Sequence, residues 1–302
     1  MIKRNVRAAV LCFGEMLWDS LPGGLFPGGA PMNVAYHLHQ LGRRAAPVSA
    51  VGKDALGDEL FRRVNGWGLD TSLIRTRDDK PTGWVRVKTG HAGPAYDIMK
   101  NVAWDWIELP KNPPGWVKQA GALIFGSLAQ RATHNRKQFK RLRGLCGNAL
   151  KIFDVNLRPP YDSPELVWSL AQSADVIKLN HDEATRLLKR NYSVKQLGLA
   201  ARDLSQKTNC PHICITAGSK GAGLLLDSHW NWVPGNPIKV KDTVGAGDSF
   251  LAALVHGLLA GDQSAPDMLT RARSLAEFVA AHDGATPAYT VSSAGKIRAA
   301  KF

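Results

Sequence analysis

Short apolar segments alternate along most of the chain with longer segments in which apolar residues recur every third or fourth position. The short segments are typical of buried strands, and the longer ones of helices with one apolar face. The predicted strands span residues 8–13, 46–51, 122–128, 151–157, 175–180 and 212–218. The predicted helices span residues 31–41, 54–65, 133–143, 163–172, 181–190 and 195–208. This alternation indicates an α/β fold whose mostly parallel sheet is covered on both faces and binds ligands beyond the carboxyl ends of its strands.

Two segments, residues 15–29 and 82–108, interrupt the alternation because they are rich in glycine, proline and aromatic residues. The second contains TGWVRVK, in which apolar and polar residues alternate as in a strand with one buried face. We expect the two segments to form a small antiparallel β flap that covers one edge of the core. Its aromatic side chains serve as a packing seam, a dimer contact or both. Because the sequence contains no internal repeat or linker, we expect residues 1–302 to form one domain.

The composition is that of a soluble globular protein, with 44% hydrophobic residues in a chain of 302. No apolar run approaches the roughly 18–20 residues of a membrane-spanning helix. The N-terminus, MIKRNVRAAVLCFGE, begins as a signal peptide does, but its short apolar run leads directly to Glu15. We interpret this run as the first strand and expect a cytoplasmic protein without a membrane partner. The cysteines lack metal-binding spacing and are expected to be buried, reduced thiols: Cys12, Cys146, Cys210 and Cys214.

The net charge of +14 favours anionic partners. Basic residues cluster in HNRKQFKRLRG at 134–144, which also has the pattern of a helix with a solvated basic face. No nucleic-acid-binding motif and no interleaved aromatic residues accompany this cluster. We therefore expect anionic small-molecule substrates and no nucleic acid, with charge-driven nucleic-acid binding as the least favoured alternative.

The sequence DTVGAGDSF (242–250) places two glycines directly before an apolar run of helical spacing that ends near Gly261. Glycine is costly inside a helix, so Gly245 and Gly247 are expected at its start, where unpaired backbone N–H groups carry a partial positive charge. Such an end suits a phosphate, and small residues allow its close approach. Asp248 follows in the first turn. An acid there is equally typical of ordinary helix capping, so this motif alone leaves both interpretations open.

The same sequence resembles the second signature motif of the ribokinase-like (PfkB) carbohydrate kinases, and PGGAPMNVAYHLHQLG (27–42) resembles the first. The two motifs lie in the family's order, more than 200 residues apart, and the likeness extends over residues 8–288. The resemblance implies a ribokinase-like, three-layer α/β core with a small β lid, and ATP-dependent phosphorylation of a sugar. It also implies ATP and Mg²⁺ as cofactors and, as in many relatives, a monovalent cation such as K⁺ near Asp242.

The resemblance assigns roles to residues at the start of the helix in the second motif. Asp248 matches the general base that takes the proton from the attacking sugar hydroxyl. We expect its position at a helix start to keep the pKa of its carboxyl low, so that it is ionised. Gly245, Ala246 and Gly247 match the anion hole around the transferred phosphoryl group.

The sugar site implied by the resemblance combines a carboxylate, an amide and close backbone approach: Asp19, Asn33, Gly28 and Gly29. A carboxylate and an amide suit vicinal hydroxyls, because both can form paired hydrogen bonds. Asn156 and Arg158 in NLRPP follow a predicted strand, where Arg158 would hold a sugar oxygen or a phosphate. The alternative for Asn33 is a helix cap, and the alternative for Arg158 is a loop contact.

On the nucleotide side, KLNHDEA contains Asn180-x-x-Glu183, which matches the family's element for magnesium and phosphate. A helix cap followed by a first-turn acid has the same pattern. ITAGSKGAG resembles the strand and turn beside the ADP moiety, and HDGATP resembles the end of the adenine pocket. These segments point to Thr216, Gly218, Gly221 and Gly284.

Three segments, GEMLWD, AWD and DVNLRPP, most resemble fructokinases, which phosphorylate the 6-hydroxyl of fructose. The alternatives are another sugar or sugar-acid kinase, such as one for 2-keto-3-deoxygluconate, and a catalytically silent protein that binds sugar or nucleotide. The flap is expected to act as a lid that closes over the sugar and excludes water. It is also the expected contact surface of a homodimer.

Overall fold

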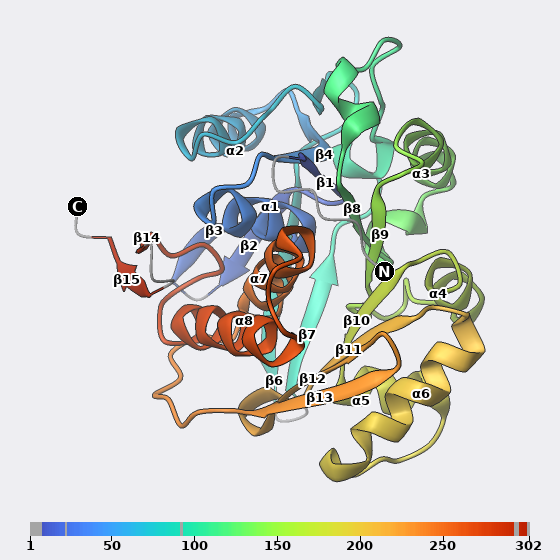
Figure 1. Cartoon of the computed structure of the whole chain (residues 1–302). Helices are drawn as coiled ribbons and strands as arrows, with labels where there is room; N and C mark the ends of the chain where they lie inside the picture. The colour runs from blue at the N-terminus through green and yellow to red at the C-terminus, as the bar shows by residue number, and fades with distance from the viewer. Residues whose placement is uncertain (1–7, 22, 91–92, 293–295, 301–302) are drawn as a thin grey trace.

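The computed structural model describes residues 8–21, 23–90, 93–292 and 296–300. Their large central sheet has the strand order β13-β12-β11-β10-β9-β8-β1-β4-β5 (Figure 1). The strands are β1 Val10–Phe13, β4 Ala45–Gly52, β5 Ile74–Arg77, β8 Ala122–Gly126, β9 Leu150–Asp154, β10 Val176–Asn180, β11 His212–Thr216, β12 Gly221–Leu226 and β13 His229–Pro234. Neighbours from β11 to β5 run parallel, whereas β12 is antiparallel to both β11 and β13. The predicted, mostly parallel α/β fold is therefore confirmed.

Helices cover both faces of this sheet (Figure 1). One apolar core includes α1 (Ala30–Gln40), α2 (Ala55–Gly66), α7 (Ala246–Ala260) and α8 (Ala265–Ala280). The other includes α3 (Thr133–Leu145), α4 (Pro164–Ala171), α5 (His181–Leu188) and α6 (Leu197–Thr208). α7 is buried along nearly its whole length because it packs against both α1 and α8. None of the helices in the described ranges combines the length and the apolar character that a membrane span requires.

All six predicted strands and all six predicted helices are present, with ends that differ by a few residues. The apolar run after Gly247 forms α7, which Gly261 ends in a left-handed conformation with φ of 69°. The sequence did not predict α8, β5, β12 or β13. Asp227 and Ser228 join β12 to β13 with φ of 46° and 69°, as a tight hairpin turn requires. The four cysteines are buried, free thiols, as predicted.

A second sheet, with the order β3-β2-β6-β7, is built from the two segments that interrupt the alternation. Its strands are β2 Leu17–Leu21, β3 Gly24–Gly28, β6 Gly83–Gly90 and β7 Gly93–Ile98; residues 22, 91 and 92 of the two segments lie outside the described residues. The β2–β3 and β6–β7 hairpins are antiparallel, but β2 and β6 pair in parallel. The prediction of a wholly antiparallel flap is therefore wrong, because β2 and β6 both leave the main body in the same direction.

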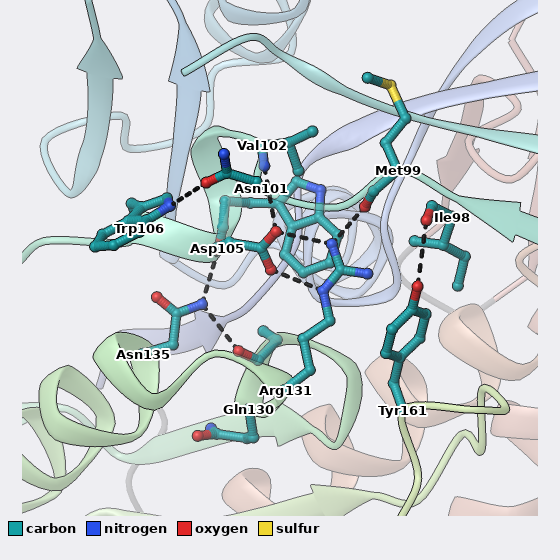
Figure 2. Close-up of polar contacts among 12 residues, drawn as sticks. Ile98, Met99, Asn101, Val102, Asp105, Trp106, Gln130, Arg131, Asn135 and Tyr161 are labelled. Carbon is teal, nitrogen blue, oxygen red and sulfur yellow. Dashed lines mark hydrogen bonds and ion pairs between the residues drawn. The ribbon is translucent and has the colours of Figure 1, made fainter. Parts of the chain in front are cut away.

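Residues 99–108 do not belong to the small sheet, because they return into the core. A short 3-10 helix spans Ala103–Trp106, and Trp104 is only 1% exposed. Figure 2 shows how Arg131 ties this segment to the main body: Nε donates to Asp105 Oδ1 and Nη2 to Asp105 Oδ2, each at 2.8 Å. Nη2 also donates to the carbonyl of Met99, one residue after β7. This ion pair fixes the base of the small sheet.

Candidate active site

The parallel strands place several polar residues at one edge of the sheet, where the carboxyl ends of the strands meet. Glu15 follows β1, Asp154 ends β9, Asn180 ends β10 and Thr216 ends β11. In the strand register Asn180 lies beside Thr216, and Asp154 lies beside Lys178 of β10. Ligands of open α/β sheets bind at this edge. The functional site is therefore expected at this edge of the sheet.

Gly245 begins α7 at this edge, and its backbone conformation requires glycine. Its φ is 78°, and an added Cβ would lie 2.5 Å from Ala285 Cα. Asp242 holds the segment before Gly245 in place. Its Oδ1 accepts a hydrogen bond from Val244 N at 3.0 Å, and its Oδ2 accepts one from Gly284 N at 3.2 Å. Ala246 N–H donates to the carbonyl oxygen of Thr243 at 3.3 Å, whereas the N–H groups of Gly247 and Asp248 have no intrahelical acceptor. The turn therefore presents a partial positive charge on small residues, and its role as an anion hole stays a prediction.

Asp248 and Asn33, both predicted as site residues, are brought together from distant parts of the chain. Asn33 Nδ2 donates to Asp248 Oδ2 at 2.8 Å. Asn33 lies in the first turn of α1 and is 3% exposed, and Asp248 is 9% exposed. The Asn33 side chain makes no capping bond in α1. Its amide instead orients the carboxylate of Asp248.

Burial raises the pKa of Asp248 from 3.8 to about 6, and the nearby carboxylate of Asp154 adds to this effect. The hydrogen bond from Asn33 and the positive charges of Lys178 and Arg158 act in the opposite direction. The prediction of a low pKa is therefore wrong, since desolvation outweighs the favourable field of the helix start. A pKa near 6 leaves the carboxyl mostly ionised at neutral pH and makes it a stronger proton acceptor.

Asp19 in β2 faces the same site across two glycines. An added Cβ at Gly28 would lie 2.1 Å from Asp19 Oδ2, and one at Gly29 would lie 2.3 Å from the carbonyl oxygen of Glu15. Both glycines are thus required by close packing around these acids. Burial raises the pKa of Asp19 to about 7, and the charge of Asp248 adds to this while Arg158 opposes it.

Asn156 and Arg158 lie in the loop after β9. Asn156 has a φ of 37°, a left-handed conformation that asparagine tolerates better than most residues. The positive charge of Arg158 lowers the pKa values of Glu15, Asp19 and Asp248, so it lies close enough to act on all three acids. The structure therefore gathers the predicted sugar-site residues Asp19, Asn33 and Arg158 around Asp248.

Glu15 is a site residue that the sequence analysis used only as the end of a strand. It is 5% exposed, and its Oε2 has no hydrogen-bond partner among the described residues. Burial raises its pKa to about 7. Glu15 and Asp154 line a small cavity of about 10 Å³ between the first turns of α1 and the ends of β8 and β9. An acid directly after an apolar strand was the sequence signal that could have identified it.

Asn180 and Glu183 form a reciprocal cap at the start of α5. Asn180 Oδ1 accepts from Glu183 N at 2.9 Å, and Glu183 Oε2 accepts from Asn180 N at 2.8 Å. Glu183 Oε1 accepts from Leu157 N at 2.8 Å. The helix-cap interpretation therefore describes this pair, and Glu183 also ties α5 to the loop that carries Asn156 and Arg158. No cluster of three metal-ligating side chains occurs in the described part of the chain.

The predicted nucleotide residues lie in two places. Gly218 has a φ of 56°, and no atom lies within 4 Å of an added Cβ, so it borders open space after Thr216. Gly221 is instead required by strand packing, because an added Cβ would lie 2.1 Å from the carbonyl oxygen of Val233. Gly284 lines a cavity of about 570 Å³ between α1, the end of α2 and residues 283–289, and none of the other predicted residues lines it.

Lys178, in the middle of β10, was missed by the sequence analysis. It is 7% exposed, and its Nζ donates to Asp154 Oδ1 at 3.0 Å. An added Cβ at Gly247 would lie 3.1 Å from this ammonium, so Lys178 reaches the first turn of α7. A lysine within an otherwise apolar strand, DVIKLN, was the available signal.

Comparisons with known proteins identify the family. The family model described as pfkB family carbohydrate kinase matches residues 23–291. A candidate sugar kinase of Pyrococcus horikoshii is 32% identical over 242 residues, which are 77% of this chain and 73% of the relative. Its crystal structure in complex with ATP aligns with a TM-score of 0.75 and 27% identity, covering 92% of this chain and 94% of that one.

Two further relatives carry names that state different acceptors. An Arabidopsis thaliana protein named as a fructokinase is 27% identical over 314 residues, 97% of this chain and 88% of the relative. The 2-dehydro-3-deoxygluconokinase of Bacillus subtilis is 30% identical over 246 residues, 77% of this chain and 74% of the relative.

The family match and the identity to the Pyrococcus protein lead to one conclusion. This chain belongs to the pfkB family of carbohydrate kinases and is a phosphotransferase that acts on a sugar hydroxyl group.

Proposed function

We propose that the protein transfers the terminal phosphoryl group of ATP to the 6-hydroxyl of fructose, with Asp248 as the general base. One observation carries this proposal. The carboxylate of Asp248 is buried, held by Asn33 at 2.8 Å, and lies in the first turn of the glycine-started helix α7. The first turn of α7 thus contains both a proton acceptor, Asp248, and a helix start that can bind an anion. Phosphoryl transfer to a hydroxyl needs both.

In this mechanism the protein orients its substrates and stabilises charge. Asp248 accepts the hydroxyl proton as the oxygen attacks the phosphorus atom. The first-turn N–H groups around Gly245, Ala246 and Gly247 bind the oxygens of the transferred group, whose charge is spread over them during transfer. Asp19 and Arg158 hold the remaining sugar hydroxyls in position, because a carboxylate accepts and a guanidinium donates hydrogen bonds.

The residues on the nucleotide side fit a Mg²⁺–ATP complex that brings most of its own metal ligands. Magnesium in such sites keeps several waters and binds the phosphates, with few protein carboxylates. Both oxygens of Glu183 accept backbone N–H bonds, so Glu183 fits a place behind the metal's waters better than direct coordination. When bound, the ion would neutralise phosphate charge. Thr216 and Gly218 border the space in which the ADP moiety would lie.

The choice of acceptor rests on the acids near Asp248. Asp19 lies near Asp248, Glu15 and Arg158, whose charges all act on its pKa. Burial favours the neutral forms of Glu15 and Asp19, which can share hydrogen bonds with a neutral polyol, whereas the carboxylate of 2-keto-3-deoxygluconate would add a further anion beside Asp248. The relative named as a fructokinase supports fructose, and the Bacillus subtilis relative supports the sugar acid as the second candidate. ADP release measured with fructose, ribose and 2-keto-3-deoxygluconate tests this choice. A larger kcat/KM for the sugar acid or ribose would overturn the assignment of fructose.

Substitution of Asp248 tests the general base. In Asp248→Asn the side chain keeps its size but no longer accepts the proton, so kcat should fall by roughly 10²–10⁴ while the Kd for sugar changes little. Asp267→Asn is the matched control, because Asp267 is an exposed acid in the first turn of α8. It should lose a little stability and no activity. A folded Asp248→Asn enzyme with more than a tenth of the normal kcat would exclude the catalytic role.

A further inference from the structure

Lys178 and Asp154 form a buried ion pair inside the central sheet. Their side chains are 8% and 6% exposed, and Nζ lies 3.0 Å from Oδ1. Burying two charges is costly, and their attraction repays this only where the remaining hydrogen-bonding positions are also filled. Here Asp154 Oδ2 is buried with no partner in the described part of the chain. As a stabilising element the pair is therefore incomplete.

The ammonium of Lys178 lies at the N-terminal end of α7, where a cation is unfavourable. An added Cβ at Gly247 would be 3.1 Å from Lys178 Nζ, which places the charge against the first turn of α7. A helix N-terminus carries a partial positive charge, so a cation there is unfavourable in the absence of an anion. The protein thus concentrates two sources of positive potential at one point.

The surrounding acids keep Lys178 charged. Burial alone lowers the pKa of the ammonium, but the carboxylates of Asp154, Glu183 and Asp248 outweigh this and raise it. Every one of these acids lies at the carboxyl edge of the sheet or in the first turn of a helix that starts there. A fixed positive charge is therefore available at that edge at neutral pH.

We propose that Lys178 adds its positive charge to the anion hole at Gly245–Gly247 and stabilises the phosphoryl group during transfer, and that Asp154 positions the ammonium. This inference rests on the proposed function, because it takes the first turn of α7 as the phosphoryl site. A charge within a site of low dielectric acts strongly on charge that develops nearby, and it needs no reorganisation during the reaction. Lys178 supplies charge to the phosphoryl group, Asp154 is the positioning residue, and proton transfer belongs to Asp248.

Three variants test this role: Lys178→Met, Asp154→Asn and the two combined. In Lys178→Met, kcat should fall by about 10²–10³ with little change in the KM for sugar, because the lost interaction develops in the transition state. The single variant also leaves Asp154 buried without a partner, so its melting temperature should fall. The double variant removes both charges and should recover most of the melting temperature, but its kcat should stay low. Recovery of both in the double variant would mean that the pair is only structural and would overturn the proposal.

A binding measurement gives a second test that does not need turnover. ADP with aluminium fluoride and sugar mimics the phosphoryl group in transfer, and such mimics bind through the interactions that the transition state uses. Lys178→Met should bind this mimic at least tenfold more weakly and bind ADP alone as the wild type does. Equal weakening of both ligands, or of neither, would contradict the proposal. Lys178→Arg, which retains the charge, should keep more activity than Lys178→Met.

Two controls separate this inference from the proposed function. Lys151 lies at the opposite end of the neighbouring strand β9, where its Nζ donates to the Gly147 carbonyl at 2.7 Å. Lys151→Met should leave kcat unchanged. Asp248→Asn is measured in parallel. If Asp248→Asn loses activity and Lys178→Met does not, only the role of Lys178 fails; if Asp248→Asn stays active, the phosphoryl site itself is misplaced.

Discussion

Two buried ion pairs among the described residues have similar exposure but differ in how their carboxylates are bonded. Arg131 and Asp105, at the base of the small sheet, have side chains that are each 8% exposed, and Lys178 and Asp154 are 8% and 6% exposed. Both oxygens of Asp105 accept hydrogen bonds from Arg131. Asp154 has one bonded oxygen and one that has no partner among the residues that the structure describes. Burial alone therefore does not distinguish the two pairs, but the bonding of the carboxylate does.

The two pairs also differ in their surroundings: aromatic rings pack against Arg131, whereas further carboxylates surround Lys178 and Asp154. The guanidinium of Arg131 lies over the rings of Trp104 and Tyr161, at 4.1 and 4.6 Å from their centroids, and this packing fixes its position. At the carboxyl edge of the sheet, Glu15, Asp19 and Asp248 all have raised pKa values because carboxylates there are desolvated and outnumber the cations. We infer that the first pair holds the fold together, and that the second holds the charge of Lys178 against the first turn of α7.

The largest effect should come from breaking the structural pair. Arg131→Met leaves Asp105 buried without its partner, which should lower the free energy of unfolding by about 3–5 kcal/mol. Chemical denaturation measures this loss. The kcat of the folded fraction should remain near that of the wild type, because Arg131 lies outside the group of residues around Asp248. A tenfold loss of kcat without loss of stability would reverse the assignment of the two pairs.

A smaller effect should appear in the pH dependence of stability. The pKa of Glu15 is 4.5 in the unfolded chain and about 7 in the folded protein, because burial favours the neutral acid. Between these values the folded state keeps a proton that the unfolded state releases, so stability falls as pH rises from about 4.5 to 7. This difference in pKa corresponds to about 3 kcal/mol. The contribution of Glu15 to the free energy of unfolding is thus full below about pH 4.5 and lost above about pH 7.

Glu15→Gln removes the titration and isolates this contribution. The difference in unfolding free energy between Glu15→Gln and the wild type should grow in favour of the variant from pH 5 to pH 8. Denaturant titrations at the two pH values measure it. Glu59→Gln is a suitable control, since Glu59 is held by Arg62 and Arg63 on the surface of α2. An equal difference at both pH values would mean that Glu15 is already ionised in the folded protein at pH 5.

Local patterns predicted most of the fold, because apolar periodicity reflects which face of each element is buried. The β12–β13 hairpin escaped prediction because Asp227 and Ser228 are not the usual Asn-Gly or Asp-Gly turn. α8 was also missed, although Ser264 accepts from Asp267 N as an N-cap and Pro266 lies in the first turn. These were local signals that the periodicity analysis did not use.

The candidate site was predictable only as far as its residues lie in sequence motifs. The motifs identified Asp248, Asn33 and the glycines, but the pKa of Asp248 depends on how α1, α7 and the sheet exclude water. Lys178 and Asp154 are 24 residues apart and meet only through the register of β9 and β10. Gly221 fitted a nucleotide motif, yet its missing side chain is explained by the carbonyl of Val233. A lysine within an apolar strand can be noticed in the sequence, but its partner, the pKa of Asp248 and the reason for Gly221 depend on tertiary packing.

The smallest expected effect is a shift in the acidic limb of the pH–rate profile. Asp248 must be ionised to accept a proton, and its pKa is about 6, so kcat/KM should fall as the pH drops below about 6. Lys178 lowers this pKa and Asp154 raises it. Lys178→Met should therefore move the limb to higher pH by about one unit, and Asp154→Asn should move it to lower pH. The opposite directions of the two shifts are decisive, because a general loss of stability would move the acidic limb of both variants in the same direction.

Arg131→Met serves as the control and should leave the acidic limb in place. If Lys178→Met and Asp154→Asn gave the wild-type profile, the ion pair would be electrostatically separate from Asp248, and the contrast between the two buried pairs would be one of packing alone.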